Sequence, residues 1–325
     1  MQQIIIRENE AGQRLDKLLA KYLSEAPKSF LYKMLRKKNI TLNGKKAAGN
    51  EKLKTGDEVK LFLADETIEK FSGGAGRPPV KIPSVKLDIL YEDDNILLIN
   101  KPVGMLSQKA ADTDVSVVEH LIAYLLESGQ LTEAQMRTFK PSVCNRLDRN
   151  TSGMIAAGKS LKGLQELSRL FKDRTLEKYY LCLTKGKVEE SLRIRGYLTK
   201  DEKTNQVKIT KTEEPGSTLI ETEYRPLESG KDVTLLEVHL ITGKTHQIRA
   251  HLASVGHPIL GDYKYGDRTV NESYKSMYGL THQLLHAYRL VFPHLEGSLG
   301  NLSGKEFTAP LPKEFQKIAE DRGVL

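Results

Sequence analysis

The sequence predicts an α+β protein in which a small α/β module precedes a larger domain with a mixed, largely antiparallel sheet. Three observations support this fold class. The chain has 325 residues, more than the roughly 100–200 of a typical domain. A stretch rich in glycine and proline interrupts it at 71–79. Beyond that stretch, strand-like and helix-like runs alternate irregularly, without the steady strand–helix repeat of a doubly wound parallel sheet.

Composition is that of a soluble protein with a packed core. Apolar residues make up 39% of the chain and charged residues 28%, which argues against wholesale disorder. No run approaches the ~18 apolar residues that span a bilayer, and the first residues become charged too soon for a signal peptide. The two cysteines, Cys144 and Cys182, fit a reducing compartment. We therefore expect a cytoplasmic protein without a membrane partner.

Residues 1–64 are expected to form a compact module. The spacing of apolar residues predicts a helix over 14–23 and a second helix capped by Ser29. Short strands are expected at 40–42 and 58–63, each beside a turn sequence that contains glycine. From 28 to 46 there are seven basic residues and no acidic one, within a chain whose formal net charge is +8. This concentration of charge favours a polyanionic partner.

Two short helices, the second basic, followed by a turn and a strand resemble the RNA-binding module named after ribosomal protein S4. The matching segments are 14–19, 35–44 and 56–59. The resemblance implies that basic side chains of this module neutralise RNA phosphates, whereas the plain alternative is a solvated helix face. The residues expected to bind RNA are Lys33, Arg36, Lys37, Lys38 and Lys45.

A linker is expected over 65–86, because its centre is rich in glycine and proline. The larger domain would then occupy 87–325. Its strand-like runs are 95–100, 153–157, 178–183, 233–241 and 284–292. Its helix-like runs are 115–126, 161–171 and 245–255.

Several kinds of site are excluded by their missing patterns. The chain has no GxxxxGK[ST] phosphate loop, no GxGxxG between a strand and a helix, and no GxSxG elbow. His246, His251 and His257 are separated by five and six residues, which matches neither an HExxH helix nor a Cys/His finger. We therefore expect no metal and no nucleotide cofactor.

The segment Asn145–Gly153, with the sequence NRLDRNTSG, holds Asp148 between two arginines. Neighbouring positive charge favours the ionised carboxylate, which can act as a nucleophile or a base. The same Arg-Leu-Asp occurs at 14–16, where no Thr-Ser-Gly follows and an acid suits the start of a helix. Taken alone, the Arg-Leu-Asp at 146–148 also fits an ordinary surface loop with a local ion pair.

Two further segments carry candidate residues. In 176–183, Lys178 precedes two tyrosines in a strand-like run. In 240–252, a strand ends at a Thr-Gly turn and Thr245 is placed to cap a helix, with Arg249 one position past its core-facing Ile248. The structural alternatives are a tyrosine that fills the core and an arginine that pairs with a surface acid.

Together with 94–104 and 261–266, these segments are similar to the RluA/RluC/RluD-type family of pseudouridine synthases, over about 88–312. The resemblance implies a pseudouridine synthase fold and the isomerisation of uridine to pseudouridine in RNA. This reaction needs no cofactor, metal or net redox change. The S4-like module favours large-subunit (23S) ribosomal RNA as the partner, with transfer RNA as the alternative.

The resemblance also implies roles for individual residues. Asp148 would be the catalytic aspartate, which either attacks the anomeric carbon or removes a sugar proton. Arg249 would pair with it, and Tyr179 would stack on the target base. Arg146 would fill the gap left by a flipped uridine. The other residues expected to bind substrate are Arg149, Lys178, Lys244, His246 and Gln247.

Two positions depart from the family pattern. Asn145 stands where many members have histidine, and Lys244 stands where arginine is common. These departures bear on substrate choice more than on the reaction. Two other functions stay open: a non-catalytic RNA-binding assembly factor on an inactive synthase fold, and a uridine-specific RNA glycosylase. A monomer is expected.

Overall fold

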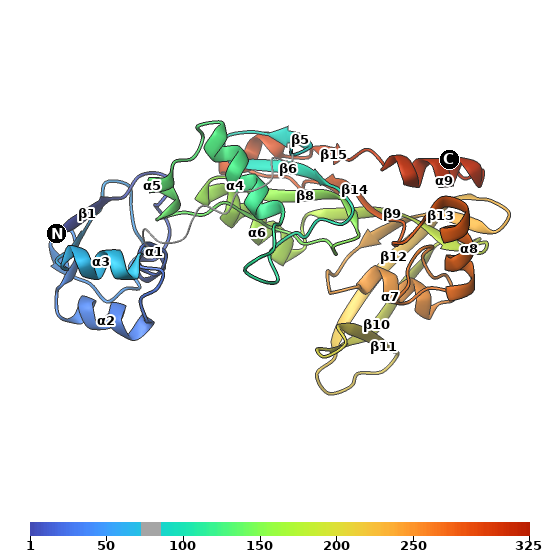
Figure 1. Ribbon diagram of the computed structural model, residues 1–325, viewed down its shortest axis with the longest axis horizontal. Helices are drawn as coiled ribbons and strands as arrows, with labels where there is room; N and C mark the ends of the chain where they lie inside the picture. The colour runs from blue at the N-terminus through green and yellow to red at the C-terminus, as the bar shows by residue number, and fades with distance from the viewer. Residues whose placement is uncertain (73–85) are drawn as a thin grey trace.

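The computed structural model describes residues 1–72 and 86–325 (Figure 1). These residues form two units, each with its own sheet and its own hydrophobic core. We call residues 1–72 the N-terminal unit and residues 86–325 the large unit. The expected α+β class is confirmed, because the large sheet is mixed and mostly antiparallel.

The N-terminal unit packs helices against a four-stranded antiparallel sheet with the order β1-β4-β2-β3. Apolar residues on one face of each of the first two helices fill the core, whereas the basic residues of the second helix stay exposed. That second helix begins at Lys28 after Pro27, not at the expected Ser29 cap. The elements are β1 (Gln2–Ile5), α1 (Leu15–Tyr22), α2 (Lys28–Arg36), β2 (Ile40–Leu42), β3 (Lys45–Lys46), β4 (Glu58–Leu61) and α3 (Asp65–Phe71).

The range 65–86, expected to be a linker, starts with helix α3. Ile68 of this helix is 1% exposed and belongs to the core of the N-terminal unit, and Phe71 packs against Phe30. The compact part of this unit therefore continues beyond the expected boundary at residue 64. Residues 73–85, which hold the glycine- and proline-rich sequence, lie outside the described residues.

The large unit contains an 11-stranded sheet among its described residues. The main order is β11-β10-β12-β13-β9-β14-β8-β6-β5, with β7 beside β8 and β15 beside β14. Only the pairing of β14 with β8 is parallel in this sheet as described. The strands are β5 (Ile89–Glu92), β6 (Ile96–Lys101), β7 (Ser142–Val143), β8 (Ser152–Gly158), β9 (Glu177–Lys185), β10 (Leu192–Asp201), β11 (Gln206–Thr210), β12 (Thr218–Ser229), β13 (Val233–Leu240), β14 (Leu285–Val291) and β15 (Glu306–Thr308).

Helices cover both faces of this sheet. On one face, α4 and α7 bury apolar residues against β6, β8, β9 and β13. On the other face, α6 and η1 pack on β6 and β8, while α8 and α9 pack near β9 and β13. The helices are α4 (Val117–Glu127), α5 (Glu133–Met136), α6 (Leu161–Asp173), α7 (Gln247–Ser254), α8 (Arg268–Tyr278), η1 (Gly297–Leu302) and α9 (Lys313–Asp321). No helix in the described ranges is long and apolar enough to cross a membrane.

Strands β10, β11 and β12 are not among the expected elements. They extend the sheet beyond β13 in the order β12, β10, β11 and project from the large unit (Figure 1). Many of their side chains are exposed or half-buried, and polar residues occupy both faces. Such strands lack the apolar run by which the buried strands of the same sheet are predicted.

The two units touch through α5, α6 and the loop before α1. Thr138 donates to Oε1 of Glu10 at 2.9 Å, and both residues are buried. The side chain of Asn9 accepts the backbone N–H of Leu161, the first residue of α6, at 2.6 Å. The guanidinium of Arg137 lies over the ring of Tyr22, 4.1 Å from its centre. These contacts fix the N-terminal unit to the start of α6.

Candidate active site

Asp148 lies in the loop between β7 and β8, and its side chain is 27% exposed. Its Oδ2 accepts a hydrogen bond from Nη1 of Arg249 at 2.9 Å. Nε2 of His246 is 3.8 Å from the same oxygen. Its Oδ1 accepts no hydrogen bond from any described residue. One carboxylate oxygen is therefore held by Arg249, and the other has no hydrogen-bond donor among the described residues.

Arg249, in helix α7, is fixed by a second carboxylate. Its Nε and Nη2 donate to the two oxygens of Asp262 at 2.7 and 2.9 Å. This planar two-point contact fixes the guanidinium in one orientation. Burial alone would lower the pKa of Arg249, but the bonds and charge of Asp262, together with Asp148, raise it above its ordinary value. The arginine is therefore charged and directed at Asp148.

Asp262 is 1% exposed and is fixed in its turn by the backbone that follows it. Its Oδ1 accepts the N–H groups of Lys264 at 2.9 Å and Tyr265 at 3.1 Å. Burial raises the pKa of Asp262, but the bonds and charge of Arg249 outweigh it and hold the pKa below the usual value. A buried carboxylate with this many donors stays ionised.

His246 and Tyr265 form the wall beside Asp148. Nδ1 of His246 is 2.9 Å from the hydroxyl of Tyr265, and the ring of Tyr265 lies 5.3 Å from the guanidinium of Arg249. Burial lowers the pKa of His246, although the charge of Asp148 opposes this shift. His246 has a left-handed backbone (φ 52°) and directly precedes α7, where Thr245 is the expected cap.

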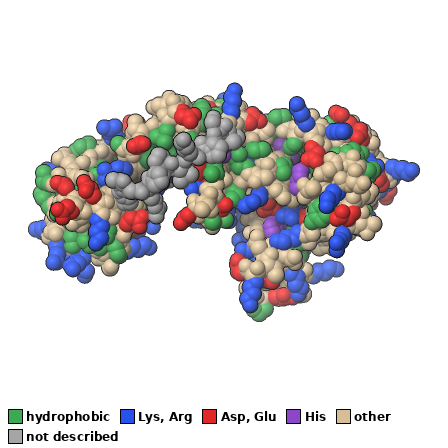
Figure 2. Space-filling model, in the orientation of Figure 1, with side chains coloured by type: hydrophobic (Ala, Val, Ile, Leu, Met, Phe, Trp, Pro, Cys, Tyr) green, Lys and Arg blue, Asp and Glu red, His purple; other side chains and the backbone are tan. Residues whose placement is uncertain are grey.

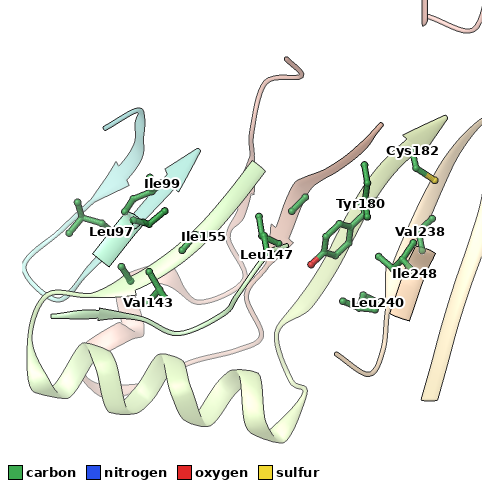
Figure 3. Packing of buried hydrophobic residues seen from close by; sticks show 14 of the residues in the cluster. Leu97, Ile99, Val143, Leu147, Ile155, Tyr180, Cys182, Val238, Leu240 and Ile248 are labelled. Carbon is green, nitrogen blue, oxygen red and sulfur yellow. The ribbon is translucent and has the colours of Figure 1, made fainter. Parts of the chain in front are cut away.

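Tyr180, not Tyr179, is the tyrosine on the Asp148 side of the sheet. Tyr180 is 7% exposed and belongs to the same core cluster as Leu147 and Ile248 (Figure 3). Burial raises the pKa of its hydroxyl, and the negative charge of Asp148 raises it further. Its packing with Leu147, the residue before Asp148, places the tyrosine on the same side as the carboxylate.

Tyr179 faces the opposite side, because successive strand residues alternate between faces. Its ring stacks on His239 at 4.7 Å and lies under the guanidinium of Arg289 at 3.9 Å, and its hydroxyl donates to Glu177. Both faces of the ring are therefore already covered by side chains. The expected stacking of Tyr179 on the target base is contradicted by this position.

The sequence Thr151-Ser152-Gly153 fastens the end of the Asp148 loop to its surroundings. The hydroxyl of Thr151 accepts from Gln283, and that of Ser152 donates to Nδ1 of His286, whose Nε2 donates to a backbone carbonyl. Gly153 has φ +107°, and a Cβ there would lie 2.2 Å from a backbone oxygen of β14. Thr151 and Ser152 are therefore fixed by side-chain hydrogen bonds, and at Gly153 there is no room for a side chain.

Comparisons with known proteins assign this geometry to a family. The sequence profile of RNA pseudouridylate synthases matches residues 95–254, and that of the S4 domain matches residues 13–59. The chain is 31% identical over 329 residues to the ribosomal large subunit pseudouridine synthase C of Vibrio vulnificus, with 98% of this chain and 96% of the relative covered. The chain belongs to the RNA pseudouridylate synthase family.

Other relatives agree. The Escherichia coli (strain K12) protein named ribosomal large subunit pseudouridine synthase C is 32% identical over 293 residues, with 90% of this chain and 88% of that protein covered. The solved structure of human RNA pseudouridylate synthase domain containing 4 matches with a TM-score of 0.56 at 24% identity, over 71% of this chain and 91% of the other. The expected synthase fold, S4 domain and isomerase class are confirmed.

Of the remaining residues expected at the site of this synthase, three are exposed and one is largely buried. Arg146 and Arg149 are exposed beside Asp148, and no acidic group lies within 4 Å of either in the part of the chain described. Lys244 is exposed at the turn before α7. Lys178 is largely buried on the Tyr180 side of β9, and burial, with the charge of Arg174, lowers its pKa.

Gln247 does not face the site, contrary to its expected role in binding substrate. It is 2% exposed, and its amide oxygen accepts from the hydroxyl of Thr242 and the N–H of Lys244. Its amide nitrogen donates to the carbonyl of Glu221 and the hydroxyl of Thr222. Since all its hydrogen-bonding capacity is used inside the protein, Gln247 anchors α7 to β12.

Four residues of the site were not singled out from the sequence. Asp262 and Tyr265 lie in the segment 261–266, and Tyr180 directly follows the expected Tyr179. Lys101 is fully buried, and its Nζ donates to the carbonyls of Pro102, Met105 and Arg149, each at 2.9 Å. Burial lowers the pKa of Lys101 to about 7, and Asp148 opposes that shift.

Other expectations concern metal ions and the N-terminal unit. Within residues 1–72 and 86–325, no group of three or more His, Cys, Asp or Glu residues is placed to hold a metal ion.

The five residues expected to bind RNA are exposed on α2, on the turn after it and on β3, and none has an acidic partner within 4 Å in those ranges. They are Lys33, Arg36, Lys37, Lys38 and Lys45.

Proposed function

We propose that the protein converts uridine to pseudouridine in large-subunit ribosomal RNA, with Asp148 as the catalytic carboxylate. The contact of Arg249 Nη1 with Asp148 Oδ2, made rigid by Asp262, carries this proposal. It orients Oδ2 of Asp148, while Oδ1 accepts no hydrogen bond from the described residues. The relatives named as ribosomal large subunit pseudouridine synthases support the choice of RNA.

The reaction breaks the bond between the sugar and the base nitrogen and forms a bond between the same sugar carbon and a base carbon. Asp148 Oδ1 supplies the electron pair that acts on the sugar, and Arg249 stabilises the carboxylate in that geometry. Tyr180, which packs with Leu147, and Tyr265, which is bonded to His246, are the aromatic residues near Asp148, where the base has to turn. Arg146 and Arg149, both exposed, are placed to contact the phosphates or bases of a distorted RNA.

The decisive experiment maps pseudouridine in ribosomal RNA from cells that lack the protein, complemented with the wild type or with Asp148→Asn. We expect at least one uridine to lose its modification, to regain it with the wild type, and to stay unmodified with Asp148→Asn. In vitro, Asp148→Asn should lower kcat on the order of 10⁴-fold or more, as in enzymes that lose a reacting side chain.

The matched control is Asp16→Asn, the same change in the other Arg-Leu-Asp, where Asp16 bonds to Arg14 and Tyr32 on the N-terminal unit. Full activity of Asp148→Asn would contradict the catalytic role of Asp148, whereas no loss of pseudouridine in cells that lack the protein would favour a non-catalytic assembly factor. Release of free uracil with abasic RNA would favour a glycosylase. Loss of modification in transfer RNA alone would change the substrate but keep the chemistry.

We also propose that the basic surface of the N-terminal unit binds RNA phosphates. Figure 2 shows lysine and arginine side chains gathered at the lower edge of this unit, where α2 lies in Figure 1. Neutralising Lys33, Arg36 and Lys37 together should weaken RNA binding and make the salt dependence shallower by about two to three units of logarithmic slope. The value of kcat at saturating RNA should stay unchanged.

A charge-matched control removes three exposed lysines near the C-terminal end of the chain, Lys305, Lys313 and Lys317. This control should leave both the affinity and the salt slope close to those of the wild type. Equal effects of the two triple variants would mean that only net charge matters, and the assignment of this surface to RNA would then be wrong.

A further inference from the structure

A buried serine holds the residue that precedes Asp148. The hydroxyl of Ser107 accepts the backbone N–H of Leu147 at 2.9 Å and donates to the backbone carbonyl of the same residue at 2.8 Å. Ser107 is 4% exposed, and Leu147 is 8% exposed. One hydroxyl therefore satisfies both backbone groups of Leu147, as an extended neighbouring strand would do.

These two bonds act directly on the backbone of Asp148. The carbonyl of Leu147 and the nitrogen of Asp148 belong to one planar peptide unit. Fixing that carbonyl fixes the plane from which the Asp148 side chain starts. The side chain of Leu147 is held as well, because it packs in the core with Tyr180 (Figure 3).

The same short segment also holds the residue that follows Asp148. The carbonyl of Arg149 accepts from Nζ of Lys101 at 2.9 Å and from the N–H of Gly104 at 3.0 Å. The residues on both sides of Asp148 are therefore bonded through backbone groups to residues 101–107. Only Ser107 reaches the Leu147 side of the loop within that segment as described.

Ser107 is itself rigidly placed. The preceding residue, Leu106, pairs with Ser116 as a short parallel bridge, and its carbonyl accepts the N–H of Val117 at 2.9 Å. Val117 is the first residue of α4. The serine therefore connects the start of α4 to the loop that carries Asp148.

We propose that Ser107 is a positioning residue for the isomerisation, which sets the approach of Asp148 to the sugar without touching the RNA. This inference rests on the proposed role of Asp148. Ser107→Ala removes both bonds, frees the Leu147 peptide and lets the carboxylate leave its bond with Arg249. The chemical step then slows, whereas RNA binding by the exposed arginines and the N-terminal unit is unchanged.

The test uses the full chain and unmodified large-subunit ribosomal RNA that carries [5-³H]uridine. Pseudouridine formation replaces the bond from C5 to hydrogen, so tritium release reports each turnover. We expect Ser107→Ala to lower kcat about 10- to 100-fold with KM within twofold of the wild type, and Ser107→Thr, which keeps the hydroxyl, to recover most of this loss. Rates are divided by the folded fraction measured at the same temperature.

The matched control is Ser160→Ala, which also removes one hydroxyl with two hydrogen bonds, at the start of α6. It should lower stability and leave kcat unchanged. If Ser107→Ala does not fold, Ser107→Cys serves instead, because a thiol keeps the volume with weaker and longer bonds; its kcat should fall at least threefold.

A folded Ser107→Ala or Ser107→Cys variant with kcat equal to the wild type would overturn the inference, as would a fall in kcat matched by Ser160→Ala. The Asp148→Asn variant separates this result from the proposed function. If Asp148→Asn is inactive and Ser107→Ala is fully active, only the role of Ser107 fails. If Asp148→Asn is active, the catalytic role of Asp148 fails first.

Discussion

Asp262 receives two hydrogen bonds from Arg249, so a carboxylate that does not face the open side of the site fixes the guanidinium that holds Asp148. The third nitrogen of Arg249 is thereby left with a single direction, toward Asp148. A lysine at this position could not make the same three contacts, because its ammonium is a point charge without a planar fork.

The first prediction concerns Asp262→Ala. This variant leaves a buried arginine with an incomplete partner, which should cost about 3–5 kcal/mol of stability. The freed guanidinium should also lose its alignment, so kcat should fall roughly 100-fold. Urea unfolding and tritium release measure the two effects. As a control, Asp267→Ala breaks a half-exposed ion pair with Lys185 and a helix cap, and should leave kcat unchanged.

The second prediction separates two adjacent tyrosines. Tyr180→Phe should lower kcat about 100-fold or more if the hydroxyl beside Asp148 takes part in proton transfer, with little change in stability. Tyr179→Phe, the identical change on the opposite face, should keep kcat within twofold. A larger fall in kcat for Tyr179→Phe than for Tyr180→Phe would show that Tyr179, and not Tyr180, acts in the reaction.

The third prediction concerns Gly153→Ala. The added Cβ would meet backbone atoms of Ala287 at 2.2 Å, at a φ of +107°. Both the clash and the conformation are unfavourable, so stability should fall by roughly 2–5 kcal/mol. Gly129→Ala isolates the second effect, since Gly129 has φ +71° with open space around it, and should cost only about 1–2 kcal/mol. Equal losses in urea unfolding would contradict the steric argument.

The fourth prediction concerns pH. Burial lowers the pKa of His286 and of His251 from 6.5 to about 4. Between these values the unfolded chain binds a proton that the folded chain does not, so stability should decrease as pH falls below about 6.5. Each histidine should account for roughly 2 kcal/mol at pH 5. His286→Gln should therefore remove roughly 2 kcal/mol of the loss of stability between pH 6.5 and 5, with the exposed change His294→Gln as the control.

Much of the N-terminal unit and of the site could be predicted from the sequence. Apolar spacing identified α1 and most of α2, because one face of each is buried. Asp148 and Arg249 were expected to pair on the basis of family resemblance, and they lie 2.9 Å apart. The half-exposed strands β10 to β12 were missed because polar residues on both faces remove the alternating pattern.

The wrong expectations share a physical cause. Tyr179 and Tyr180 differ by one position, and in a strand one position reverses the face on which a side chain lies. Gln247 follows His246 in the sequence, yet its amide turns inward to complete four hydrogen bonds. Neighbours in the sequence therefore face opposite sides, and only the packing of β9 and α7 decides which one lies on the Asp148 side.

The contact of Asn9 with the first amide of α6 has a mechanical consequence. Helix α6 packs directly on β8, the strand that begins four residues after Asp148. A force that pulls on the N-terminal unit would therefore load this helix and then the strand that follows the Asp148 loop. The proposed RNA-binding surface and the proposed catalytic carboxylate would then share one mechanical framework.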